Sequence, residues 1–211
     1  MDSITRLVVS IPIFLLAIIV HEIAHGYVAS LFGDDTAKRQ GRLTMNPIAH
    51  IDPMGILVFF LAGIGWAKPV PVNIALLRPR RLGEVLVSAA GVASNLMQAL
   101  VWSLLVRALL PHVGASSYVE AALRFCLIGV SVNVLLLAFN LLPIPPLDGF
   151  HIITGALGIT GSYGVTRLEQ AGMLFIVLLA VLGRIGGVSI LSRLIGIGYD
   201  PILQLLLRGI A

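Results

Sequence analysis

The sequence predicts an all-α membrane protein with several transmembrane helices, and three observations lead to this fold class. Hydrophobic residues make up 58% of the 211 residues and charged residues only 11%, whereas soluble domains carry about 25% charged residues. Apolar runs close to the ~20 residues that cross a bilayer recur along the chain. The basic residues fall mostly in the loops between these runs, so the net charge of +4 reflects membrane orientation and does not indicate nucleic-acid binding.

Five segments qualify as membrane-spanning helices by length and apolar character. In chain order they are Ile4–Phe32, Glu84–Leu110, Ala121–Leu142, Leu168–Leu182 with its flanks, and Ser189–Leu207. A sixth apolar run, Met54–Trp66, is too short to cross, contains three glycines and follows Pro53. Such a run is expected to form a short re-entrant hairpin, because irregular backbone is tolerated at membrane depth only where protein or water covers it.

The loops predict the orientation of the chain. The two loops that flank the short run share one side, which their seven basic residues mark as cytoplasmic: Lys38, Arg39, Arg42, Lys68, Arg78, Arg80 and Arg81. Loop 111–120 has no lysine or arginine, so we place it outside. Five spans then put the C-terminus inside. We expect one membrane domain over residues 1–211, with a core over 4–151 and C-terminal helices over 152–211.

The first predicted helix carries an unusual group, His21-Glu22-Ile23-Ala24-His25. Two histidines four residues apart lie on one helix face, about 6 Å apart along the axis, and can bind one zinc ion. Glu22 flanks the metal and can take a proton from water, as in H-E-x-x-H zinc hydrolases. The alternative is a pair of packed core histidines. The membrane setting argues against it, because a buried charged side chain costs about 2.5–3.5 kcal/mol to insert and such groups usually have a function.

A catalytic zinc ion usually has three protein ligands, and several side chains are candidates for the third. They are Asp148, His50, Asp52, His151 and, on the predicted outer side, His112. The prolines at 143, 145 and 146 forbid a regular helix after the third span and favour an extended segment. Asp148 could therefore fold back toward the histidines. Equally, the Pro-Pro-Leu-Asp-Gly stretch could be a turn in which Asp148 caps the next helix, and for His50 and Asp52 we favour a structural role in the loop.

The sequence resembles the site-2 protease family of intramembrane zinc metalloproteases, in its compact prokaryotic branch. Three stretches carry the resemblance: the H-E-x-x-H group, the stretch Asn140–Gly149, which matches N-x-x-P-x-P-x-L-D-G, and a weaker G-x-x-x-N element, Gly91–Asn95. The resemblance spans about residues 8–151. It shows no inserted peptide-binding domain, so family rules on substrate selection through such a domain do not transfer.

The resemblance implies a role for each matched residue. His21, His25 and Asp148 would bind one Zn²⁺, and Glu22 would be the catalytic base. Asn140, and more weakly Asn95, would lie near the site and hold the substrate backbone or the oxyanion, although interhelical hydrogen bonding explains both asparagines equally well. The substrates would be transmembrane proteins cleaved in the bilayer of a prokaryotic cell membrane, with the active site toward the cytoplasm.

Other functions remain open from the residues alone. A membrane zinc transporter or sensor would use the same histidines, but it should show polar ligands along several spans, and the candidates cluster instead. A zinc hydrolase acting on lipids or small amides would use the same groups as a protease. The single cysteine, Cys126, excludes an intrachain disulfide and makes a thiolate metal site a poor candidate.

Overall fold

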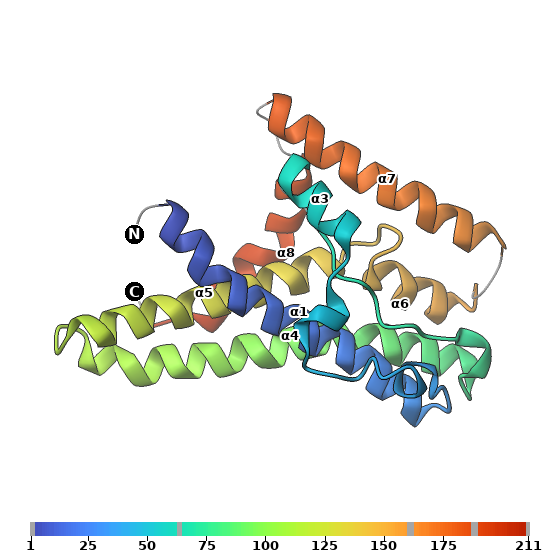
Figure 1. Ribbon diagram of the computed structural model, residues 1–211, viewed down its shortest axis with the longest axis horizontal. Coiled ribbons are helices and arrows are strands. Elements are labelled where there is room, and N and C mark those ends of the chain that lie inside the picture. The colour runs from blue at the N-terminus through green and yellow to red at the C-terminus, as the bar shows by residue number, and fades with distance from the viewer. Residues whose placement is uncertain (1–2, 63–64, 160–162, 187–189, 210–211) are drawn as a thin grey trace.

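The computed structural model describes residues 3–62, 65–159, 163–186 and 190–209. Throughout these ranges the regular secondary structure is helical, as predicted (Figure 1). The α-helices are α1 (Ser3–Leu31), α2 (Thr36–Arg39), α3 (Pro53–Ala62), α4 (Arg80–Leu109), α5 (Ser117–Asn140), α6 (Asp148–Leu157), α7 (Tyr163–Gly186) and α8 (Ile190–Leu206). Three short 3₁₀ turns, η1 (Pro47–His50), η2 (Ile74–Leu76) and η3 (Leu110–His112), lie between them.

Three long helices, α1, α4 and α5, form the centre of the molecule (Figure 1). Helices α4 and α5 run antiparallel, joined through η3, and Ser116 caps α5 by accepting a hydrogen bond from the Val119 amide. Helix α1 packs against both, and α6 packs on the first half of α4. Helix α8 lies against α5, where Leu206 joins the apolar cluster of Val106 and Val130. This packing puts the middle of α1 beside α4 and α6.

Three described helices are long and apolar enough to cross a membrane. They are the stretches Val9–Leu31, Arg80–His112 and Ser117–Asn140, and they correspond to the first three predicted spans. The other two predicted spans are helical, as α7 and α8, but neither is among these candidates. Helix α8 has only 17 residues. The predicted count of five spans is therefore not established.

The predicted hairpin over Met54–Trp66 contains helix α3, and its residues 63–64 lie outside the described part of the chain. Beyond them the chain returns to the base of α3, because a methyl group on Gly55 would collide with the backbone of Trp66. Asp52 joins the two legs: its carboxylate accepts hydrogen bonds from the Met54 amide at 2.9 Å and from the Trp66 indole at 3.0 Å. Asp52 therefore has the structural role that we favoured.

The proline-rich connection between α5 and α6 differs from its prediction. Helix α5 ends at Asn140, three residues before Pro143 and two residues before the predicted end of this span at Leu142. The connection is not extended, however, because the Leu147 amide donates to the Ile144 carbonyl at 2.9 Å and closes a tight turn. This turn reverses the chain, so that α6 begins at Asp148 beside α1 and α4.

The C-terminal part of the chain also departs from the prediction. Arg107, near the end of α4, donates to the carbonyl oxygens of Leu206 and Arg208 at 3.1 and 3.0 Å. Arg107 lies about 40 Å along the helix from Arg80, at 1.5 Å per residue. The end of α8 is thus on the side opposite to the basic loops and on the same side as the start of α1 (Figure 1). The end of α8 and the basic loops therefore lie at opposite ends of α4, whereas the prediction places the C-terminus on the side of the basic loops.

Candidate metal centre

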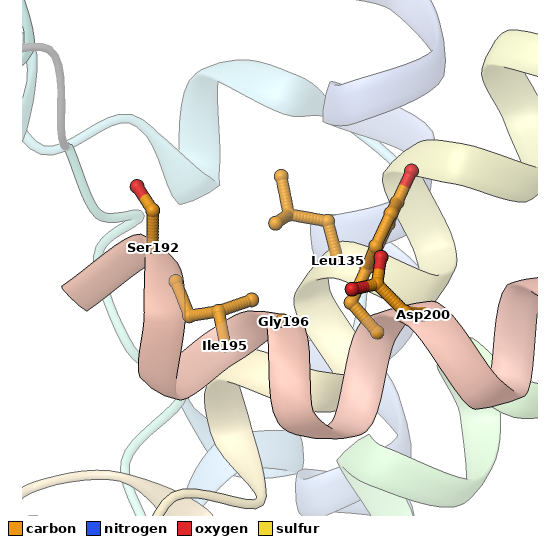
Figure 2. Close-up of a pocket in the computed structure, with 6 residues that line it drawn as sticks. Leu135, Ser192, Ile195, Gly196 and Asp200 are labelled. Carbon is orange, nitrogen blue, oxygen red and sulfur yellow. The ribbon is translucent and has the colours of Figure 1, made fainter. Parts of the chain in front are cut away.

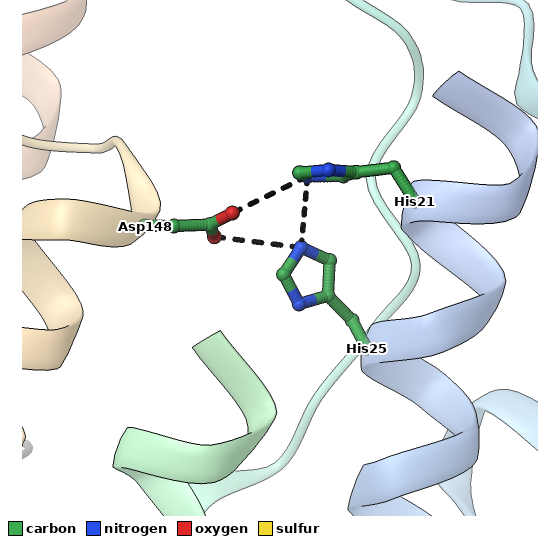
Figure 3. Close-up of side chains that lie close together, drawn as sticks. All are labelled: His21, His25 and Asp148. Atoms are coloured by element: carbon green, nitrogen blue, oxygen red, sulfur yellow. Dashed lines mark hydrogen bonds and ion pairs between the residues drawn. The ribbon is translucent and has the colours of Figure 1, made fainter. Parts of the chain in front are cut away.

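Three side chains from two helices converge in the middle of the bundle. His21 and His25 project from α1, and Asp148 projects from the first turn of α6 (Figure 3). The Nε2 atoms of the histidines are 3.0 Å apart, and the Asp148 oxygens lie 3.3 Å from His21 Nε2 and 3.4 Å from His25 Nε2. Their ligand-type atoms lie within 4.8 Å of one another, and no other such group occurs among the described residues.

The Nδ1 atoms of His21 and His25 both make hydrogen bonds to other residues of the protein. His25 Nδ1 lies 2.7 Å from the Val87 carbonyl oxygen, which can only accept, so this Nδ1 carries the proton. His21 Nδ1 lies 2.7 Å from Oδ1 of Asn95 and donates to it in the same way. In their neutral forms both rings therefore turn an unprotonated Nε2 toward the centre.

This donor set fits a divalent cation. Two imidazole lone pairs and a carboxylate face one another with little solvent exposure, and they repel unless a positive charge lies between them. Zinc binds imidazole and carboxylate at about 2.0–2.2 Å, which puts tetrahedral ligand atoms about 3.3 Å apart. The observed separations of 3.0–3.4 Å agree with that value. The hydrogen bonds to Nδ1 are those that metal-binding histidines typically make.

Asp148 reaches the histidines because of its local structure. It is the first residue of α6, and Leu147, not Asp148, occupies the cap position. A methyl group on Gly149 would collide with the carbonyl oxygens of Leu141 and Leu142, so only glycine lets α6 start this close to the end of α5. The carboxylate is therefore directed at the ring nitrogens, and it does not cap its own helix.

Gly91 has an equivalent role on α4. A methyl group at this position would lie 2.6 Å from His21 Cε1 and 2.5 Å from His25 Cε1. Carbon atoms normally approach to about 3.5–4.0 Å, so α4 can pack against the two rings only because this residue has no side chain.

Glu22 points to another segment of the chain. Its Oε2 accepts a hydrogen bond of 2.7 Å from the amide of Val70. Val70 lies between Pro69 and Pro71, which have no N–H group, so it supplies the one amide of this tripeptide. Segment 67–73 is tied down on both sides, since the Lys68 amide donates to the His50 carbonyl and the Asn73 amide donates to Asp34.

The remaining candidates for the third ligand lie elsewhere. His50 bonds the Thr44 carbonyl at 2.8 Å, His151 faces Glu169 at 3.6 Å, and Asp52 accepts hydrogen bonds from the Met54 amide and the Trp66 indole. His112 lies at the far end of α4, exposed to solvent.

The two asparagines of the sequence motifs are placed differently. Asn95 is fully buried between α1, α4 and α5, and its side chain bonds His21, the Ala17 carbonyl and Asn133. Asn140 donates to the Leu136 carbonyl at 3.0 Å, one turn earlier in α5. Sequence reasoning missed Asn133, although a buried amide in an apolar span is a usable signal. It also missed the contact of Glu22 with Val70, for which the sequence has no signal.

A separate cavity of about 240 Å³ lies between α5 and α8, lined by Leu135, Ser192, Ile195, Gly196, Tyr199 and Asp200 (Figure 2). None of the histidines lines it, so it is distinct from the metal centre.

Comparisons with known proteins agree with this site. A profile of peptidase family M50 matches residues 9–183, a range that contains all three converging side chains. "Putative zinc metalloprotease YwhC" of Bacillus subtilis is 43% identical over 189 residues, which cover 88% of this chain and 84% of that protein. "Putative zinc metalloprotease Rip2" of Mycolicibacterium smegmatis is 30% identical over 80% of this chain and 64% of its own length. "Putative zinc metalloprotease Rip2" of Mycobacterium tuberculosis is 28% identical over 82% of this chain and 67% of its own length. No solved structure matches the chain.

Proposed function

We propose that this chain, which belongs to peptidase family M50, hydrolyses peptide bonds of transmembrane protein substrates within the lipid bilayer. Membership makes the chain a zinc metalloprotease of the site-2 protease family. The observation that carries the proposal is the meeting of Asp148 with a histidine pair halfway along an apolar helix. His21 and His25 lie about 15 and 9 Å from the end of α1 at Leu31, at 1.5 Å per residue, which is within the depth of a bilayer.

The proposed zinc ligands are His21 Nε2, His25 Nε2 and a carboxylate oxygen of Asp148, for one ion per chain. Zinc, when bound, would supply Lewis-acid chemistry that acidifies water and polarises a carbonyl oxygen. The residues of the chain hold this arrangement: α1 fixes the spacing of the rings, and the turn before α6 brings in the carboxylate.

Glu22 is the proposed general base. Its carboxylate takes the proton of the attacking water while the water oxygen bonds to the peptide carbon. It then gives that proton to the amine nitrogen as the C–N bond breaks. The Val70 amide holds Oε2 at 2.7 Å, which orients the carboxylate and leaves its second oxygen to receive the proton. Asn140 is proposed to donate a hydrogen bond to the substrate backbone or the oxyanion. Its amide nitrogen has two protons, and the bond to the Leu136 carbonyl uses only one of them.

The substrate must present an extended stretch, because an intact helix uses its carbonyl groups in its own hydrogen bonds. We therefore propose transmembrane substrates that are cleaved near helix-weakening residues, in a prokaryotic cell membrane, with the site nearer the cytoplasmic side. The basic loops support this orientation, since they lie at the end of α1 that is closer to His25. We further propose that the chain is one domain, as the apolar contacts of α7 and α8 with the core support.

The decisive experiment replaces Glu22 with glutamine. Glu22→Gln removes the base but no proposed zinc ligand, so the variant should hold as much zinc as wild type and cleave a membrane-embedded reporter about 10²–10⁴-fold more slowly. Glu120→Gln, at an exposed carboxylate that pairs with Arg124, is the matched control. Unchanged cleavage by Glu22→Gln would refute the assignment of the base.

A further inference from the structure

Asn95 and Asn133 form a polar connection through the apolar centre of the bundle. Both side chains are 0% exposed. Asn95 Nδ2 donates to Asn133 Oδ1 at 3.1 Å, and Asn95 Oδ1 lies 2.7 Å from His21 Nδ1. The connection therefore runs from α5 through α4 to a proposed zinc ligand on α1, three helices that pack side by side (Figure 1).

Two backbone carbonyl groups determine the direction of every hydrogen bond in this connection. The Gly129 carbonyl can only accept, so the Asn133 atom 2.9 Å from it is Nδ2, and Oδ1 of Asn133 must face Asn95. The Ala17 carbonyl, 3.4 Å from Asn95, likewise requires Nδ2 of Asn95 on that side. Oδ1 of Asn95 is then left to face His21, where it accepts the Nδ1 proton.

This direction has a consequence for the metal centre. If the Asn95 amide turned over, its NH₂ group would face His21 Nδ1, and the proton would move to Nε2, the atom proposed to bind zinc. Asn133 and Ala17 each use one of the two Asn95 amide protons, and the Asn133 contact, at 3.1 Å, is the shorter of the two.

We infer that Asn133 is a positioning residue of the zinc site, which acts through Asn95 to keep the proton of His21 on Nδ1 and its Nε2 free for the metal. The inference rests on the proposed function, because it takes His21 as a zinc ligand. The hydrogen bonds of Asn133 go to Asn95 and to the Gly129 carbonyl and not to a proposed ligand or the proposed base, so its effect passes through the Asn95 amide.

The test measures zinc affinity by competition with a chelator of known affinity, using the full-length protein in detergent. Asn133→Leu and Asn133→Ala should bind zinc about tenfold more weakly, at the lower end of the 10–100-fold loss typical of residues that support a ligand. Asn133→Asp keeps an oxygen toward Asn95 and, when protonated in apolar surroundings, a donor toward Gly129, so it should restore most of the affinity. Gln98→Leu is the matched control, because Gln98 on the same face of α4 also donates to the Ala17 carbonyl, at 3.4 Å.

A double-mutant cycle separates action through Asn95 from a general packing effect. Asn95→Leu alone should weaken zinc binding, and adding Asn133→Leu should weaken it no further, because the connection is already broken. The inference is overturned if Asn133→Leu and Asn133→Ala bind zinc within twofold of wild type, if Gln98→Leu loses as much affinity as they do, or if the two losses add. Failure of the wild type itself to bind zinc would instead overturn the proposed function.

Discussion

Substitution of Gly91 by alanine should damage the metal centre although it adds only one methyl group. That methyl would lie 2.5 Å from His25 Cε1 and 2.6 Å from His21 Cε1, whereas ordinary carbon contacts are about 3.5–4.0 Å. Either the rings or α4 must therefore move by about 1 Å. Functional sites tolerate displacements of about 0.5 Å, and an error of about 1 Å costs on the order of 10²-fold in rate.

We expect Gly91→Ala to bind zinc about 10–100-fold more weakly and to lose about 10²-fold in kcat/KM for a transmembrane reporter in proteoliposomes. The effect of Gly91→Ala on helix stability is favourable, in contrast to its effect on the metal centre, since alanine in place of a helical glycine stabilises a helix by about 0.5–1 kcal/mol. A loss of zinc affinity in a protein that melts no earlier would therefore locate the effect at the rings.

Gly83→Ala is the matched control for this prediction. It makes the same change on the same helix, two turns earlier, where the methyl would meet Leu77 Cβ at 3.0 Å and no histidine. Gly83→Ala should keep wild-type zinc affinity. Zinc affinity of Gly91→Ala within twofold of wild type would refute the close approach of α4 to the two rings.

Two more predictions concern the third ligand and the topology. Asp148→Ala should lose zinc on dialysis while the wild type keeps it, and wild type stripped with a chelator should regain cleavage when zinc is added back. Metal analysis and the cleavage assay check these two results. A wild-type zinc content in Asp148→Ala would contradict the ligand set. In a cysteine-free background, Arg208→Cys and Arg39→Cys should react with a membrane-impermeant thiol reagent from opposite sides of the membrane. The reason is that Arg208 lies beside the end of α4, whereas Arg39 lies in the basic loops. Labelling of both cysteines from one side would contradict the placement of α8.

The sequence predicts the parts of the site that depend on helical periodicity. Two histidines four residues apart must share a helix face, and the structure puts their Nε2 atoms 3.0 Å apart. For Asp148, the residues alone left a choice between a turn that caps a helix and a ligand that folds back. The structure shows both the turn and the carboxylate directed at the histidines, because Gly149 lets α6 start against the end of α5.

The features that sequence reasoning missed depend on contacts between distant segments. The contact between Val70 and Glu22 joins residues 48 positions apart, and no local pattern encodes it. The side on which α8 ends was predicted by counting five spans, and three of these are candidate spans among the described residues.

The weak G-x-x-x-N element acquires a physical meaning in the structure. Gly91 and Asn95 are four residues apart and therefore share one face of α4, the face that meets the histidines of α1. Gly91 removes the side chain that would block the rings, and Asn95 supplies the oxygen that holds His21 at 2.7 Å. Neither residue would suffice alone, because a larger residue at 91 would move α4 away and leave the Asn95 amide too far from His21. Together, Gly91 lets α4 pack close to the metal centre, and Asn95 then orients one of the proposed ligands, His21.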